Sequence, residues 1–369
     1  MKLFLNSAMN KREIIALTLA KELSNRDALF YINKFNSINS ILNSKLGDKF
    51  RSKFEKQSLF GSNNEYLEKA NQQLELAEKH DCNILTIEDE NYPQLLKSIS
   101  NPPVVLFTKG KLQKPDNVSV SIVGTRKATH YGRLVVERFV KDLVANNVII
   151  TSGMAYGIDS SAHTETIKSE GITYSVIASG IDKISTDRAK KLSNLILEND
   201  GCIISSHPLG VSALPPYFIQ RNRIISGLSK ATIVIESDKK GGSLWTAKFA
   251  VEQNRDLFAV PGNIFEAKCR GTNRLIEKNM AIPALNVDQI LTHVGFSEVE
   301  TKGSNKIIEF SNPIEETIFS ILSYEPMHVD DIANESELSL PEVVTNLLTM
   351  EFSSLVKQLP GNLYIRNTS

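Results

Sequence analysis

The chain has 369 residues, and its 41% apolar and 23% charged content is ordinary for a globular protein. Two or three domains are expected at this length, and the absence of any apolar run of about 18 residues argues against a transmembrane helix. The first seven residues have too short an apolar stretch for a signal peptide, so we predict a cytoplasmic protein with no membrane partner. Three cysteines without C-x-x-C spacing indicate neither a zinc site nor a disulfide framework, and we expect no metal and no cofactor.

Net charge is zero but unevenly distributed. Residues 313–369 hold nine acids and only two bases (Lys357 and Arg366), a net charge of −7, so residues 1–312 carry +7. The positive charge of residues 1–312 favours an anionic partner for that part of the chain. The negative charge of residues 313–369 argues against binding of that segment along a nucleic-acid phosphate backbone.

Residues 1–82 are rich in helix formers and have almost no strand signal, which predicts an N-terminal helical domain. Amphipathic helices are predicted at 12–23 and 65–79. Residues 45–56 interleave five bases with Leu46, Phe50 and Phe54. Such a segment is either a helix that contacts nucleic acid or a solvated face over three core residues, and we favour the second interpretation.

Residues 83–298 alternate strand and helix signals, which predicts βαβ units and a parallel sheet covered on both faces, an α/β domain. β-Branched runs predict strands at 118–123, 148–152, 172–178, 202–205, 231–237 and 257–260. Helical patterns fill the gaps at 131–146, 160–169, 187–198, 218–228 and 244–253. The preceding segment, 82–112, is interpreted as an added strand or cap on the same domain.

A polar stretch with Gly and Ser predicts a linker at 299–312. Helices are then predicted at 314–322, 328–334 and 341–350, followed by strands at 355–358 and 363–365 around a Pro-Gly-Asn turn signal. This order is typical of a winged helix-turn-helix domain over 313–369. Its expected recognition segment, 339–350, has no Lys or Arg, so we predict a protein-interaction or regulatory role for this domain.

Glycines, hydroxyls and arginines follow the strands of the central domain. The carboxyl ends of parallel strands meet at one edge of a sheet, where open α/β folds bind ligands. Glycines there allow close backbone approach, and the guanidinium forks of Arg126, Arg221 and Arg223 suit phosphate. Hydroxyl donors come from Thr125, Ser152, Ser243 and Thr246. Singly, each glycine is explained by turn geometry and each arginine by a surface salt bridge; together they predict a phosphate-binding edge.

No residue of this region stands out as catalytic, because the sequence has no Ser-His-Asp order, zinc spacing or carboxylate pair. We predict Asp159 to be a helix N-cap and His163 to be a packed histidine rather than a catalytic one. Glu236 is expected to orient an arginine rather than to act as a base.

Seven motifs follow one another in the central domain: residues 124–126 (GTR), 152–163 (SGMAYGIDSSAH), 179–182 (SGID), 218–229 (FIQRNRIISGLS), 242–247 (GSLWTA), 261–262 (PG) and 271–276 (GTNRLI). In this order and spacing, over roughly residues 83–285, the series resembles the DNA-processing protein A (DprA, or Smf) family. The flanking regions resemble that family's N-terminal SAM-like or helix-hairpin-helix module and its C-terminal winged helix.

The resemblance implies a protein of natural transformation and recombination that binds and protects single-stranded DNA and helps to load RecA. It also implies an extended Rossmann-like domain that forms a homodimer, with no catalytic activity. Carried over by position, the DNA phosphate pocket would comprise Gly124, Thr125, Arg126, Ser152, Gly153, Gly157, Arg221, Asn222, Arg223, Gly242, Ser243 and Thr246.

The chain departs from the family pattern at several positions. Tyr156 stands where many members have a basic residue, which removes a phosphate contact, although an aromatic ring there can stack on a base. Arg126, Arg221 and Arg223 must then supply most of the positive charge at this site. Residues 185–186 (ST), 205–206 (SS) and Ile219 replace the usual Tyr-Pro, Ser-Glu and Pro.

A nucleotide-processing enzyme of the LOG (phosphoribohydrolase) type is the alternative. Residues 241–246 (GGSLWT) followed by Glu252 have a faint likeness to the phosphate loop of those enzymes. Their Pro-Gly-Gly-x-Gly-Thr sequence is absent here, so we favour DNA binding.

Overall fold

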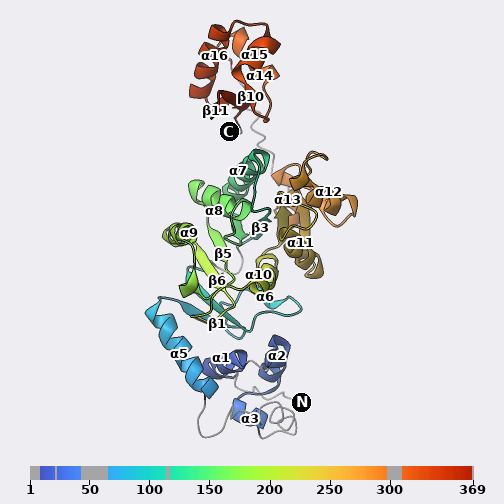
Figure 1. The fold of residues 1–369 in the computed structure, drawn as a ribbon. Helices are drawn as coiled ribbons and strands as arrows, with labels where there is room; N and C mark the ends of the chain where they lie inside the picture. Colours follow the sequence, from blue (N-terminus) through green and yellow to red (C-terminus); the bar gives the residue numbers. More distant parts are fainter. Residues whose placement is uncertain (1–8, 21–22, 43–64, 114–116, 297–309, 368–369) are drawn as a thin grey trace.

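The computed structural model describes residues 9–20, 23–42, 65–113, 117–296 and 310–367. Figure 1 shows a group of helices at the N-terminal end, a central sheet flanked by helices, and a small C-terminal unit. No helix within the described ranges combines the length and the apolar character needed to cross a bilayer. The basic segment at 45–56 lies outside the described residues, as does most of the predicted linker.

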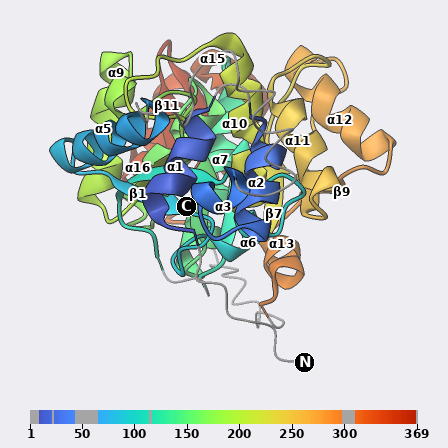
Figure 2. The same cartoon turned by 90° about the horizontal axis from the view of Figure 1, so that it is seen from below.

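In the described part of the N-terminal region, helices α1 (Lys11–Leu19), α2 (Asn25–Lys34), α3 (Ile38–Leu42) and α5 (Glu65–Lys79) pack on one end of the sheet. The helix predicted at 65–79 is confirmed, whereas α1 ends at Leu19, before residue 23, because Ala20 is extended. Ile14 and Leu17 of α1 share one apolar cluster with Phe107 and Ile203 of the sheet. Helices α1 to α3 accordingly lie below β1 in Figure 1 and in front of it in Figure 2.

The central sheet has nine strands in the order β1-β2-β6-β5-β4-β3-β7-β8-β9. The strands are β1 (Asn83–Thr86), β2 (Val105–Gly110), β3 (Ser119–Val123), β4 (Ile149–Ser152), β5 (Thr173–Val176), β6 (Cys202–Ser205), β7 (Ala231–Val234), β8 (Asp256–Ala259) and β9 (Ile282–Pro283). The six predicted strands are confirmed and pair in parallel, while β1 and β2 add an antiparallel edge. From β3 the strands β4, β5 and β6 follow on one side, whereas β7, β8 and β9 follow on the other side. Such a switch point between neighbouring strands is where open α/β sheets form a ligand-binding crevice.

Helices cover both faces, as the two apolar clusters show. One cluster joins the sheet to α7 (His130–Ala145), α8 (Ile158–Lys168) and α13 (Val287–Val294). The other joins it to α6 (Gln94–Lys97), α10 (Pro215–Gly227), α11 (Ser243–Glu252) and α12 (Arg270–Glu277). Helix α9 (Asp187–Glu198) lies beside α8. Val120 and Ile122 face the first cluster and Val123 the second, because successive side chains of a strand point to opposite faces.

The C-terminal unit is a winged helix, as predicted. It contains α14 (Pro313–Ile321), β10 (Met327–His328), α15 (Val329–Ser336), α16 (Leu340–Phe352), β11 (Val356–Leu359) and β12 (Leu363–Arg366). The antiparallel sheet has the order β10-β12-β11. Gly361 and Asn362 have φ of +90° and +55°, which explains why the hairpin turn needs glycine and asparagine.

Candidate nucleic-acid interface

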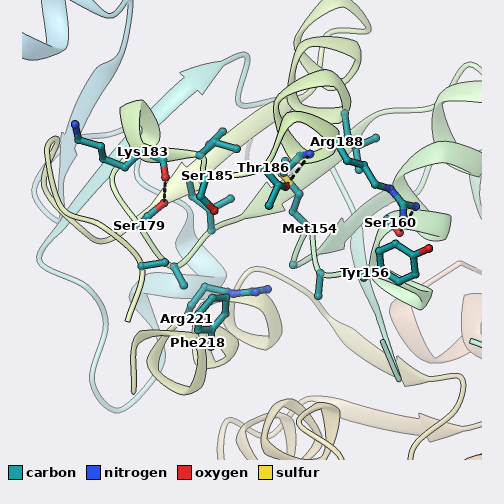
Figure 3. A pocket seen from close by; sticks show the side chains of 18 of the residues that line it. Met154, Tyr156, Ser160, Ser179, Lys183, Ser185, Thr186, Arg188, Phe218 and Arg221 are labelled. Carbon is teal, nitrogen blue, oxygen red and sulfur yellow. Dashed lines mark hydrogen bonds between the residues drawn. The ribbon is translucent and has the colours of Figure 1, made fainter. Parts of the chain in front are cut away.

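A cavity of about 310 Å³ opens beyond the carboxyl ends of β3, β4 and β5. Its walls include Arg126 after β3, the turn from Gly153 to Tyr156 after β4, the stretch after β5 that leads into α9, and helix α10. Figure 3 shows the lining side chains converging on this space. The cavity lies at the edge where the sequence predicts ligand binding.

Of the residues described in the structure, four cations line the cavity, namely Arg126, Lys183, Arg188 and Arg221, and no Asp or Glu does. Lys183 has a carboxylate partner in Asp182, at 3.9 Å. Within the described part of the chain, neither Arg126 nor Arg188 forms an ion pair with a carboxylate. The cavity therefore presents positive charge that is available to an anionic ligand.

Arg126 is exposed and lies on a loop fixed by the buried carboxylate of Glu236. The Thr125 N–H donates to the Glu236 carbonyl at 2.8 Å, and the Glu236 carboxylate accepts from the Thr129 N–H at 2.9 Å. Thr129 is the N-cap of α7, so Glu236 places negative charge at a helix N-terminus. The expectation that Glu236 orients an arginine is wrong, because its carboxylate is hydrogen bonded to Thr129 at the start of α7. The Arg126 guanidinium lies 5.6 Å from the ring centroid of Phe218.

Arg221 forms the floor of the cavity and is only 4% exposed. Its Nη1 lies 4.0 Å from Oδ2 of Asp159, which also accepts from the Ala155 N–H at 3.4 Å. Burial lowers the pKa of Arg221 to about 10, so the guanidinium stays charged at neutral pH. Burial also raises the pKa of the Asp159 carboxyl, against the opposing effect of Arg221. The expected N-cap role of Asp159 is wrong: Gly157 occupies that position, and Asp159 lies in the first turn of α8.

The turns after β3 and β4 pack directly on each other. Gly157 has φ of +84°, and a Cβ there would lie 2.3 Å from the Thr125 carbonyl oxygen. A Cβ at Gly124 would lie 2.5 Å from the side chain of Ile158. These glycines shape the loop that carries Arg126: Gly157 allows backbone to approach backbone, and Gly124 makes room for the side chain of Ile158.

Of the twelve predicted site residues, Arg126, Gly153 and Arg221 line the cavity. The other nine do not: Gly124, Thr125, Ser152, Gly157, Asn222, Arg223, Gly242, Ser243 and Thr246. Ser152 is fully buried, and its Oγ donates to the Ile122 carbonyl at 2.6 Å. Asn222 bridges α10 to the Gly242 carbonyl at 3.3 Å, while the Ser243 Oγ donates to Ser237 and Thr246 is buried in α11. Arg223 projects to another side of α10, donates to the Asn101 carbonyl and lines a separate cavity against the N-terminal helices.

Among the described lining residues outside the predicted set, four have an aromatic or cationic side chain. Phe218 and the 63% exposed Tyr156 contribute aromatic rings, and Lys183 and Arg188 contribute charge. The signal that they share in the sequence is their position. Tyr156 and Lys183 follow strands that end at this edge of the sheet, and Arg188 and Phe218 lie in helices beside it. Spacing along the sequence could not show that α9 turns Arg188 toward Tyr156.

His163 is a packed residue, as predicted. It is fully buried, its Nδ1 is hydrogen bonded to Thr173 Oγ1 at 2.6 Å, and burial lowers its pKa to about 3 with a further contribution from Arg221. In the ranges that the structure describes, no three His, Cys, Asp or Glu side chains are grouped so that they could hold a metal ion.

The fold and this edge define a class: a Rossmann-like α/β protein with a cationic cavity at its strand ends, joined to a winged helix. The profile of the family described as DNA recombination-mediator protein A matches residues 83–295, and that of the DprA winged helix domain matches residues 309–362. The chain belongs to the DNA recombination-mediator protein A (DprA/Smf) family, which confirms the expected resemblance.

Similarity to individual members of the family agrees with this assignment. Protein Smf of Escherichia coli is 32% identical over 296 residues, which cover 78% of each chain. The X-ray structure of DprA from Streptococcus pneumoniae has a TM-score of 0.64 and 29% identity, over 79% of this chain and all of that one. A structure of DNA processing protein A from Helicobacter pylori, described for its unique single-stranded DNA binding mode, has a TM-score of 0.51 and 27% identity over 57% of this chain and 94% of that one.

Proposed function

We propose that this protein binds single-stranded DNA through the cavity at the carboxyl ends of β3, β4 and β5. The observation that carries the proposal is the lining, in which the described residues include four cations and two aromatic rings but no carboxylate. Sequence-tolerant binding of single strands combines phosphate neutralisation with stacking of bases on aromatic rings. The Helicobacter pylori relative, a structural neighbour, supports the same ligand by similarity.

Family membership supports a wider role in natural transformation and recombination. In this proposal the protein is a cytoplasmic, non-enzymatic mediator that protects the bound strand and helps to load RecA. It acts as a homodimer through the Rossmann-like domain. A candidate dimer surface lies around the end of β8, where Ile264, Phe265 and Leu285 are 72%, 82% and 69% exposed. Size measurements on a Phe265→Asp variant test that surface: the variant should be monomeric.

The direct test of DNA binding compares a labelled oligo-dT with a duplex of equal length over a series of salt concentrations. We expect tighter binding to the single strand, because only unpaired bases can reach the rings. Affinity should fall steeply as salt rises, since each neutralised phosphate releases condensed counterions. Salt-independent binding, or equal affinity for the duplex, contradicts the proposal.

The alternative, a LOG-type enzyme, has weaker support. The Glu252 side chain is exposed, pairs with Lys248 at 3.7 Å and does not line the cavity. A general base must lie within hydrogen-bond reach of the proton that it abstracts. Incubation with nucleoside monophosphates should release no free base, and release of base would favour the enzyme.

For the winged helix we propose a protein partner. Helix α16 exposes Leu340, Val344, Leu348 and Phe352, spaced four residues apart, and has no Lys or Arg. Residues three or four apart share a face of a helix, so these side chains form an apolar stripe. DNA-reading helices instead bring basic and polar side chains to the groove. The stripe and the −7 charge together favour a partner with a basic, partly apolar surface.

A further inference from the structure

Tyr156 and Arg188 form a stacked pair at the rim of the cavity, although they belong to different elements. Tyr156 lies in the turn after β4, and Arg188 lies in the first turn of α9. The guanidinium carbon of Arg188 is 4.2 Å from the centroid of the Tyr156 ring. Arg188 Nη2 also donates to the Ser160 Oγ at 3.2 Å (Figure 3). Two contacts thus fix the direction of a long and otherwise flexible side chain.

The charge of Arg188 is free for a ligand. Among the residues that the structure describes, no carboxylate pairs with it, and the adjacent Asp187 lies 3.8 Å from Lys190 instead. The Ser160 hydroxyl occupies one donor of the guanidinium, which has five. The remaining donors can bind a phosphate, which a guanidinium fork recognises well.

The ring of Tyr156 also has a free face. The guanidinium covers one side of the ring, yet the residue is 63% exposed. That exposure leaves area of Tyr156 available to a base. An exposed aromatic face beside a fixed cation is the combination that holds one nucleotide, with its base on the ring and its phosphate on the charge.

We propose that Tyr156 and Arg188 form one nucleotide-binding element, with the base stacked on Tyr156 and the phosphate bound by Arg188. This inference rests on the proposed single-stranded DNA function and adds a cation from α9 to those of the strand ends. The pair lies on a different side of the cavity from Phe218 and Arg221 (Figure 3). The cavity consequently offers a ring next to a guanidinium on two of its walls.

The test separates base from phosphate with two probes of equal length, oligo-dT and an oligonucleotide of abasic sites. Tyr156→Leu should weaken binding to oligo-dT about tenfold and binding to the abasic probe much less, because only a base can stack and Ser160 still holds Arg188. Tyr156→Phe keeps the ring and should recover that loss. Arg188→Gln should weaken binding to both probes and lower the salt slope by about one.

Lys190→Gln is the matched control, since it removes one positive charge from an exposed position of the same helix outside the cavity. An equal loss in Lys190→Gln and Arg188→Gln, or an equal loss on both probes for Tyr156→Leu, overturns the inference. Another outcome is that the wild type binds oligo-dT, with binding weakened by Arg126→Ala but not by Tyr156→Leu or Arg188→Gln. In that case the Tyr156–Arg188 element is refuted, while the proposed single-stranded DNA binding stands. If the wild type binds neither probe, the proposed function fails with it.

Discussion

Arg221 occupies the space that a side chain at residue 153 would need. A Cβ built on Gly153 would lie 1.5 Å from Nη1 of Arg221 and 2.7 Å from Oδ2 of Asp159. The glycine of the β4–α8 turn and the arginine of α10 are therefore one structural unit, in which the missing side chain makes room for a buried guanidinium.

Gly153→Ala should displace Arg221 and separate it from Asp159. Breaking a buried ion pair leaves an uncompensated charge, so we expect the free energy of unfolding to fall by roughly 3 kcal/mol. Urea denaturation measures the change. Gly242→Ala is the control, because a Cβ there meets nothing within 4 Å and φ is −62°. That variant should be neutral or slightly stabilised. Equal stability of the two variants would show that Arg221 can move aside freely.

Arg126→Ala should weaken binding to any single strand by about tenfold, since a charge-assisted contact to phosphate contributes roughly 1.5–3 kcal/mol. Stability should not change, because the side chain is exposed. Fluorescence anisotropy with several oligonucleotide sequences gives the affinities. Lys127→Ala removes the neighbouring exposed charge, which does not line the cavity, and should cost much less. A loss confined to one sequence would contradict the phosphate role of Arg126.

Acid should destabilise the protein through His163, whose pKa falls from 6.5 to about 3 on folding. Between these values the unfolded chain binds a proton that the folded chain excludes. The free energy of unfolding should therefore fall by up to about 1.4 kcal/mol per pH unit below 6.5. Urea denaturation at pH 7 and pH 5 should show a smaller loss in His163→Gln than in the wild type. Identical pH profiles would mean that His163 accepts a proton in the folded state.

Removal of residues 310–369 should leave single-stranded DNA affinity within about threefold of the full chain, because the segment carries −7 and its exposed helix face lacks bases. Anisotropy on the truncated and full-length proteins provides the comparison. A much weaker complex would refute the protein-interaction role and assign DNA contacts to the winged helix.

The sequence by itself determined the class of the fold and the edge that carries the cavity. Runs of β-branched residues located β3 to β8, because parallel strands buried on both faces need continuous apolar segments. The alternation with helices then placed all strand ends at one edge. The motifs also identified the family, and the Pro-Gly-Asn signal located the hairpin of the winged helix.

Only the tertiary structure decided which side chains reach the ligand. Arg221 and Arg223 are two residues apart on α10, and a helix turns by about 200° over two residues, so they project to different cavities. Ser152 is the last residue of β4, but its hydroxyl donates to the carbonyl of Ile122 in the neighbouring strand β3 and does not reach the cavity. Arg188 is more than thirty residues from Tyr156, and their 4.2 Å stack exists because α8 and α9 pack side by side. Direction and neighbours of a side chain depend on packing between elements, which local sequence patterns do not specify.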